Sequence, residues 1–212
     1  MDGKRKITYA IVLLLVAGII AGATTLWFKE IRFRFFPKNF GIVCDNGIYR
    51  SARIHPALIE ETLKKHGIRK IVNLTGKDGR YAYEDEVAEK LGIEVYSVAL
   101  HGSGMCSAQE FADAIEQVVK AQKEKKPVLV HCSAGVNRTG AVVALYRILI
   151  EGKSPDEAYP ELLEFGWTPP KNGQMVPHLN ELMPDIAKLL VEKGLIEKAP
   201  SPTPQFKVDF KY

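Results

Sequence analysis

The sequence predicts an α/β fold in which a central, mostly parallel sheet is flanked by helices and preceded by an N-terminal transmembrane helix. Short apolar runs alternate with segments of helical periodicity over residues 40–198, a pattern typical of strands joined by crossover helices. Turn and capping residues separate these segments. Residues 1–28 differ from the rest because they hold a long uncharged run. We therefore expect one globular domain behind an N-terminal extension.

The uncharged run extends from Ile7 to Phe28. A helix rises about 1.5 Å per residue, so a run of this length can cross a bilayer core. Trp27 and Phe28 stand where an interfacial aromatic anchor lies. A cleaved signal peptide is the alternative, because Lys4–Lys6 form a basic start and Ala21-Gly22-Ala23 matches a small-x-small cleavage site. Residues 1–28 are thus predicted to be a transmembrane anchor or a signal segment.

The positive charge is concentrated around this run. Residues 1–38 contain seven Lys/Arg and two Asp/Glu, which leaves 22 basic and 23 acidic residues in the remainder. A nearly neutral domain gives no support to nucleic-acid binding. We interpret residues 29–39 as a basic juxtamembrane linker suited to anionic headgroups. If Lys4–Lys6 stay inside, the domain lies outside the cytoplasm, although the basic residues after the run oppose that orientation.

Turn and cap residues define the elements of the domain. Asp45-Asn46-Gly47 predicts a tight hairpin between two apolar runs. Ser107 and Glu110 have capping-box spacing, and Ser154-Pro155 forms another helix start. The proline-rich tail, 199–212, is expected to be poorly ordered. Further strands are predicted over 68–74, 93–100 and 127–131, and helices over 56–66, 83–91, 107–122, 138–150, 156–165 and 177–193.

The chain has three cysteines, Cys44, Cys106 and Cys132. Their spacing has no metal-ligand pattern, and no metal or cofactor is predicted. At most one pair can form a disulfide, so one thiol must stay free. A disulfide between Cys44 and Cys106 is left open.

The candidate catalytic residues lie in residues 131–140, His-Cys-Ser-Ala-Gly-Val-Asn-Arg-Thr-Gly. Cys132 directly follows a buried strand and precedes a helix N-terminus, where unpaired amides form an anion-binding nest that favours a thiolate. The planar fork of Arg138 suits two phosphoryl oxygens, and Gly135 permits the tight turn. Tyr49–Ser51 are expected to pack under this loop. The predicted phosphate-binding residues are Ser133, Ala134, Gly135, Val136, Asn137 and Arg138.

This stretch resembles the signature of the cysteine-dependent protein tyrosine phosphatase superfamily, H-C-x5-R-[ST]-G, with every fixed position present. Over roughly 40–166 the chain also resembles bacterial dual-specificity-type phosphatases, several of which carry an N-terminal membrane segment. The resemblance implies a protein-tyrosine-phosphatase-like fold and a metal-free phosphatase. By resemblance, Cys132 attacks phosphorus, Arg138 stabilises the transition state, Thr139 hydrogen-bonds the departing thiolate and His131 orients the loop.

One feature departs from that family. Its members usually place an aspartate general acid in the loop after the preceding strand, whereas residues 99–104 contain no carboxylate. His101 stands at or near that position and has a suitable reference pKa. Asp78 and Asp85 are the alternatives.

Several functions remain open at this stage. The first is hydrolysis of a phosphorylated protein or small molecule. A phospholipid or phosphoinositide phosphatase is the second, although the uncharged loop residues argue against highly phosphorylated inositols. The missing aspartate also permits a pseudophosphatase that binds phosphate without turnover. A rhodanese-like sulfurtransferase is disfavoured by the Arg138-Thr139-Gly140 ending.

Overall fold

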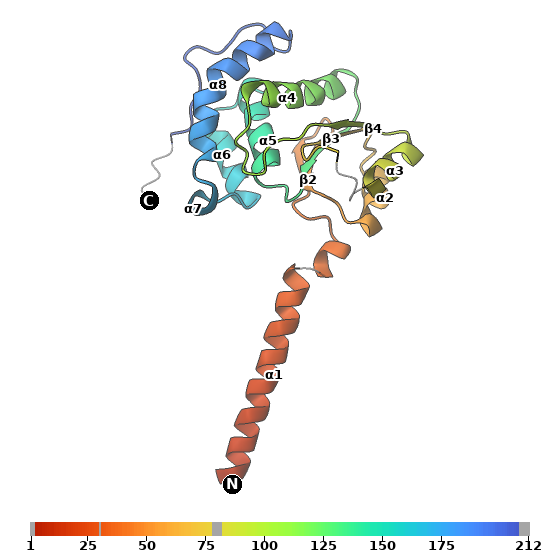
Figure 1. Ribbon diagram of the computed structural model, residues 1–212, viewed down its shortest axis with the longest axis vertical. Coiled ribbons are helices and arrows are strands. Elements are labelled where there is room, and N and C mark those ends of the chain that lie inside the picture. The colour runs from red at the N-terminus through yellow and green to blue at the C-terminus, as the bar shows by residue number, and fades with distance from the viewer. Residues whose placement is uncertain (1–2, 30, 78–81, 208–212) are drawn as a thin grey trace. The chain divides into compact units, whose positions relative to one another are not determined.

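The computed structural model describes residues 3–29, 31–77 and 82–207. The chain divides into two compact units, Met1–Phe36 and Pro37–Tyr212 (Figure 1). The first unit contains α1 (Gly3–Lys29) and the short 3-10 helix η1 (Ile31–Arg34). Trp27 stacks on Phe35 within this unit, with ring centroids 6.1 Å apart.

The N-terminal helix has the length and composition of a membrane span. An 18-residue window within Ile7–Arg34 has a mean hydropathy of 2.3, and the chain buries none of that window. Its apolar side chains are exposed along the helix. A signal sequence shares these properties, so the helix is a candidate span, and both interpretations of residues 1–28 stay open.

The second unit is built on a five-stranded sheet of order β1-β2-β5-β3-β4. The first pair is antiparallel and the other three pairs are parallel, as the sequence predicted. The Asp45-Asn46-Gly47 hairpin is confirmed, with Gly47 at a φ of +96°. The strands are β1 (Gly41–Cys44), β2 (Ile48–Ala52), β3 (Lys70–Asn73), β4 (Glu94–Ser97) and β5 (Val128–Cys132).

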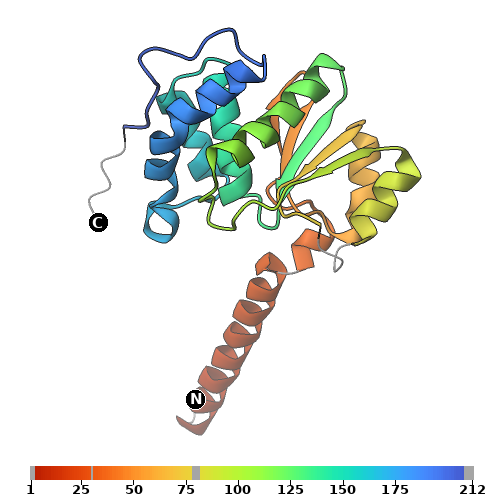
Figure 2. The same cartoon turned by 45° about the horizontal axis from the view of Figure 1, so that its top comes forward.

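Helices cover both faces of this sheet (Figure 2). On one face lie α2 (Pro56–Lys65) and α3 (Ala82–Leu91). On the other face lie α4 (Ala108–Lys123) and α5 (Asn137–Leu149). The remaining helices are α6 (Pro155–Glu164), α7 (Pro169–Asn172) and α8 (Met175–Glu192), of which α6 and α8 pack on this pair. Both predicted capping boxes form, at Ser107 and at Ser154.

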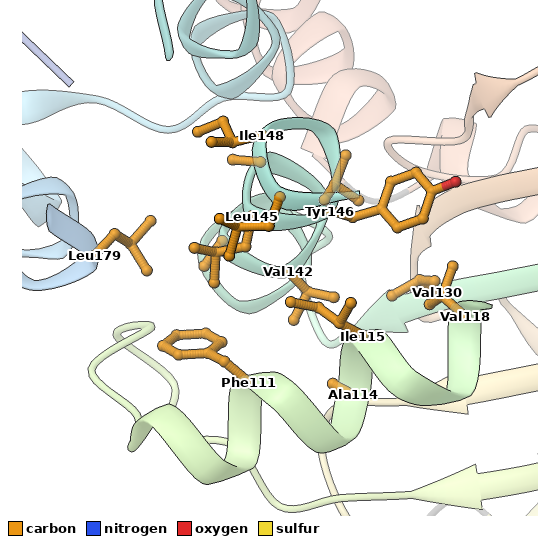
Figure 3. Packing of buried hydrophobic residues seen from close by; sticks show 14 of the residues in the cluster. Phe111, Ala114, Ile115, Val118, Val130, Val142, Leu145, Tyr146, Ile148 and Leu179 are labelled. Carbon is orange, nitrogen blue, oxygen red and sulfur yellow. The ribbon is translucent and has the colours of Figure 1, made fainter. Parts of the chain in front are cut away.

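Helix α5 is apolar nearly all round, and the structure buries it as predicted. Figure 3 shows Val142 and Leu145 of this helix packed among side chains of neighbouring elements, including Phe111 of α4 and Leu179 of α8. The helix that follows the cysteine loop is therefore held in place by core packing.

The C-terminal tail corrects one expectation. Residues 200–207 are described, and Phe206 is buried beside Tyr159, with ring centroids 6.3 Å apart. The side chain of Asn180 accepts from the Phe206 amide at 2.8 Å and donates to its carbonyl at 2.9 Å. Poor order was therefore the wrong expectation for this part of the tail, because a single aromatic residue and a matched amide fix it.

Candidate active site

The loop after β5 leaves the sheet at the carboxyl edge of its parallel strands, where α/β proteins bind ligands. In the register of β5 with β2, Ala52 lies opposite Cys132 and Ser51 opposite His131. Arg50 and Ser51 contact the loop at Gly135, as expected, whereas the ring of Tyr49 stacks on Phe40. The strand ends at Cys132, and helix α5 begins at Asn137.

The Cys132 thiol lies at the base of this loop. It is 2% exposed and accepts a hydrogen bond from the Gly135 amide, with N and Sγ 3.2 Å apart. Burial raises the pKa of this thiol, but Thr139, Arg138 and the amide of Ala134 together outweigh burial and hold the pKa below its ordinary value. The arrangement favours a thiolate, which is the nucleophilic form.

Thr139 lies in the first turn of α5 and is completely buried. Its hydroxyl makes no hydrogen bond of normal geometry with any group that the structure describes. The hydroxyl nevertheless lies close enough to Cys132 to stabilise the thiolate, which lowers the pKa of the thiol. It is therefore available to donate to the sulfur when the thiolate forms.

Arg138 connects the cysteine loop to two neighbouring strand ends. Its Nη2 donates to Ser133 Oγ at 3.0 Å. Its Nη1 lies 3.4 Å from the carbonyl oxygens of both Leu74, which follows β3, and Leu100, which follows β4. The guanidinium thus lies on the loop that also holds the thiol. The structure brings the two principal residues of the sequence motif together.

The other predicted loop residues differ in exposure. Ser133 and Ala134 are exposed, Gly135 is buried, and Val136 and Asn137 are half-buried. The loop is thus exposed to solvent at Ser133 and Ala134.

His131 precedes the cysteine and is 1% exposed. Its Nε2 lies 3.1 Å from the carboxylate of Glu84 in α3, and that carboxylate also accepts from Asn73 Nδ2 at 3.1 Å. Burial raises the pKa of Glu84, but the interactions with His131, Arg53 and Asn73 more than compensate and lower it. This buried pair fixes the orientation of the histidine and joins α3 to the base of the loop.

The three general-acid candidates have different surroundings. His101 is exposed on the loop after β4, and its Nδ1 lies 2.7 Å from Ser103 Oγ. This loop touches the start of α5, because Asn137 Nδ2 donates to the Gly102 carbonyl at 3.3 Å. Asp85 is exposed in the first turn of α3. Asp78 lies outside the described residues.

All three cysteines are free thiols, so Cys44 and Cys106 do not pair. Among the described residues, no group of three His, Cys, Asp or Glu is arranged to hold a metal ion. Burial raises the pKa of the Cys106 thiol to about 11, which leaves it protonated and unreactive at neutral pH.

Sequence reasoning missed two residues that contact the loop. Asn39 Nδ2 donates to the Ala134 carbonyl at 2.8 Å, across a separation of 95 residues. Arg50 Nη2 donates to the Gly135 carbonyl at 3.2 Å. Arg50 was expected only as part of a packing strand, although an arginine inside a strand that packs in the core is an unusual signal.

A free thiol with a lowered pKa in an amide-rich loop, followed by an arginine on a buried helix, defines a cysteine-based phosphatase site. Residues 54–181 match the family model for the dual specificity phosphatase, catalytic domain. The chain belongs to that family.

Two curated relatives illustrate the sequence similarity. The mRNA-capping enzyme of Caenorhabditis elegans is 34% identical over 139 residues, which cover 61% of this chain and 22% of that protein. The dual specificity protein phosphatase TpbA of Pseudomonas aeruginosa is 35% identical over 75 residues, which cover 35% of this chain and 34% of that protein. The chain thus spans a minor part of these relatives.

Solved structures share the fold. The crystal structure of TpbA has a TM-score of 0.60 at 23% identity, covering 74% of this chain and 91% of that chain. The structure of PTPMT1 in complex with PI(5)P has a TM-score of 0.56 at 17% identity, covering 73% and 98%. The protein-tyrosine-phosphatase-like fold is therefore confirmed.

Proposed function

We propose that this chain hydrolyses phosphate monoesters through a cysteinyl-phosphate intermediate on Cys132. One observation carries the proposal: the Cys132 thiol accepts from the Gly135 amide at 3.2 Å while Arg138 lies on the same loop. A thiolate, an amide nest and a bidentate cation are the groups that attack and hold a phosphoryl group.

The reaction has two displacements. In the first, the Cys132 thiolate forms a bond to phosphorus as the bond to the leaving oxygen breaks, and an acid protonates that oxygen. In the second, water attacks the cysteinyl phosphate, which releases inorganic phosphate and restores the thiolate. Arg138 and the loop amides bind the equatorial oxygens in both steps, and Thr139 donates to the departing sulfur.

We assign the acid to His101. The contact between Gly102 and Asn137, which lies at the start of α5, supports this assignment because it joins the loop of His101 to the cysteine loop. Proton transfer of this kind contributes roughly 10²–10⁴-fold, so its loss slows poor leaving groups most.

The substrate class we propose is a phosphorylated protein or small molecule carrying a single phosphate. The loop offers no charged side chain besides Arg138, so a second phosphate gains little from it. The TpbA structures include a complex with pTyr. The near-neutral composition of residues 39–212 disfavours nucleic acid as the substrate or partner.

A phospholipid substrate is the second candidate, and α1 is the specific observation that favours it. A helix of this kind would hold the site near a lipid surface, and PTPMT1 has been solved in complex with PI(5)P. Turnover of a phosphoinositide in vesicles without turnover of phosphopeptides would favour this candidate over the first.

For location we propose a single-pass membrane protein with an extracytoplasmic catalytic domain, and a cleaved signal with export is the runner-up. Resistance of the full-length chain to alkaline carbonate extraction would favour the anchor. Digestion of the domain by protease added outside intact cells would support the orientation. Protection of the domain from that protease would overturn it.

Hydrolysis of an activated aryl phosphate tests the phosphatase proposal. The full-length chain is assayed in detergent micelles under reducing conditions with EDTA, beside Cys132→Ser and the control Cys44→Ser. We expect turnover in the wild type and the control and none in Cys132→Ser. A folded, reduced wild type that binds phosphate without turnover would instead indicate a pseudophosphatase.

A further inference from the structure

Three successive carbonyl groups of the cysteine loop are held by the N-terminal part of the domain. The Ser133 carbonyl accepts from the Arg53 amide at 3.4 Å. The next two carbonyls, of Ala134 and Gly135, accept from the side chains of Asn39 and Arg50 at 2.8 and 3.2 Å. None of these donors belongs to the loop or to the helix after it.

These contacts determine where the loop amides point. A peptide unit is planar and trans, so its C=O and the N–H of the following residue point in opposite directions. Holding the Ala134 carbonyl outward therefore turns the Gly135 N–H inward, and this N–H is the group that donates to Cys132 Sγ at 3.2 Å. The Gly135 carbonyl fixes the Val136 N–H in the same way.

We infer that Asn39 and Arg50 are positioning residues, which set the phosphate-binding amides of the loop by holding its carbonyls outward. This inference rests on the proposed function. It extends the site to Asn39, in the stretch that joins α1 to the domain.

The backbone at Asn39 supports this assignment. Its φ is +50°, a left-handed conformation that asparagine adopts more readily than most residues. The preceding carbonyl, of Lys38, accepts from the Ala52 amide at 2.9 Å, which ties this turn to β2. Asn39 Nδ2 also lies 3.3 Å from the Phe165 carbonyl. The unusual φ thus directs the side-chain amide between the loop and the end of α6.

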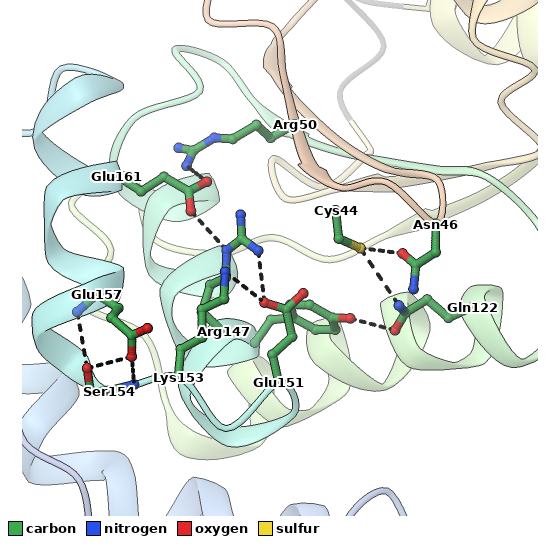
Figure 4. A network of polar contacts seen from close by, with 11 residues as sticks. Cys44, Asn46, Arg50, Gln122, Arg147, Glu151, Lys153, Ser154, Glu157 and Glu161 are labelled. Carbon is green, nitrogen blue, oxygen red and sulfur yellow. Dashed lines mark hydrogen bonds and ion pairs between the residues drawn. The ribbon is translucent and has the colours of Figure 1, made fainter.

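Several contacts fix the position of the Arg50 side chain. It is completely buried, and its guanidinium lies over the ring of Phe165, 3.7 Å from the centroid. Its Nη1 pairs with Glu161 at 2.9 Å, and the other oxygen of Glu161 accepts from Arg147 Nε at 3.0 Å (Figure 4). A buried cation is costly unless paired, and here the pairing leaves Nη2 aimed at the loop.

Phosphate protection of Cys132 tests the inference without needing turnover. Alkylation of Cys132 by iodoacetamide is followed by mass spectrometry of its peptide in the full-length chain in detergent, at rising concentrations of inorganic phosphate. The concentration that halves the rate reports phosphate affinity. The pH dependence of the alkylation rate without phosphate reports the pKa of the Cys132 thiol.

Asn39→Gly removes the donor and keeps the left-handed backbone available. Lys125→Gly is the matched control, because Lys125 has a φ of +55° and is exposed in the turn after α4. We expect Asn39→Gly to weaken phosphate protection about threefold to tenfold, the range for one net hydrogen bond, and to raise the pH midpoint of alkylation. Equal protection in the two variants would overturn the assignment of Asn39.

Arg50→Met is compared with Arg147→Met, which breaks a contact to the same carboxylate and leaves the loop contact in place. We expect Arg50→Met to weaken protection by more than about tenfold, as for a charged donor, with Arg147→Met close to wild type. Equal losses would mean that the ion pair acts only on stability. If Arg50→Met does not fold, Asn39→Gly decides the inference. Intact protection in a wild type without turnover would contradict the proposed function alone.

Discussion

Gly135 packs directly on the backbone of Ala52 at the end of β2. A Cβ placed on Gly135 would lie 2.5 Å from the Ala52 nitrogen, a distance that side chains do not reach. The φ of Gly135 is +70°, which other residues adopt only with strain. Both facts reserve this position of the loop for glycine, because neither backbone can retreat without moving Cys132 or the strand beneath it.

We therefore predict that Gly135→Ala lowers kcat/KM by about 10²-fold, the loss expected when reacting groups are displaced by about 1 Å. Steady-state kinetics with an aryl phosphate measure it. Gly152→Ala is the control, since Gly152 has a φ of +72° and open space around it. That variant should lose about 1 kcal/mol of unfolding free energy and keep its activity. Normal activity in Gly135→Ala would refute the close packing described here.

The Thr139 hydroxyl lowers the pKa of the Cys132 thiol, so its removal has a predictable sign. In Thr139→Val the thiol should ionise at higher pH, and the acidic limb of the kcat/KM profile should move upward. Measuring kcat/KM and the alkylation rate of Cys132 against pH tests this. Thr62→Val is the control, because it removes a buried threonine hydroxyl from α2, an element that is distant in sequence from the loop. If the pH profiles of Thr139→Val match those of the wild type, the Thr139 hydroxyl does not lower the pKa of Cys132.

Glu84 pairs with His131 in the core, and its interactions with His131, Arg53 and Asn73 hold the pKa of its carboxyl in the folded chain below the ordinary value for glutamate. Its contribution to stability is complete above that value and disappears as the pH falls through the folded pKa. We predict that Glu84→Gln lowers the unfolding free energy at pH 7 by about 2 kcal/mol, as for a hydrogen bond to a charged group, and makes the unfolding free energy depend less on pH in the acid range. Urea unfolding at several pH values measures both.

The exposed Glu86 on the same helix provides the control for this experiment. Glu86→Gln should leave stability within about 0.5 kcal/mol of wild type. If the two glutamine variants behave alike, the buried pair contributes no stability.

The assignment of His101 as acid predicts a dependence on the leaving group. His101→Ala should slow a poorly leaving phosphate ester by roughly 10²–10⁴-fold and an activated aryl phosphate much less, because the latter needs no proton. Asp85→Asn, at an exposed position of α3, should leave the rates with both esters unchanged. Comparing kcat across aryl phosphates of rising phenol pKa measures the effect. Equal losses for all esters would remove His101 from proton transfer.

Much of the domain is predictable from local sequence signals. The Asp45-Asn46-Gly47 turn and the Ser107 and Ser154 caps depend on neighbours within a few residues, and all three form. The position of Cys132 between a buried strand and a buried helix follows from the same kind of signal. Local hydrogen bonding and hydrophobic periodicity are sufficient for these parts.

The remaining features depend on contacts between distant segments. Asn39 reaches Ala134 across 95 residues, and Arg50 reaches Glu161 across 111. The burial of Phe206 against α8 and Tyr159 likewise follows from packing that only the folded chain creates. No pattern of spacing encodes such pairs, so the outer support of the loop was missed while its motif was found.

The covalent intermediate on Cys132 is the central claim, and rapid quenching tests it most directly. The full-length chain in detergent is mixed with an activated aryl phosphate, stopped in acid within milliseconds and digested for mass spectrometry. We expect one phosphoryl group on the peptide that contains Cys132, and none when Cys132→Ser is treated in the same way. Phosphate release without label on that peptide, or turnover that persists in Cys132→Ser, would contradict the mechanism.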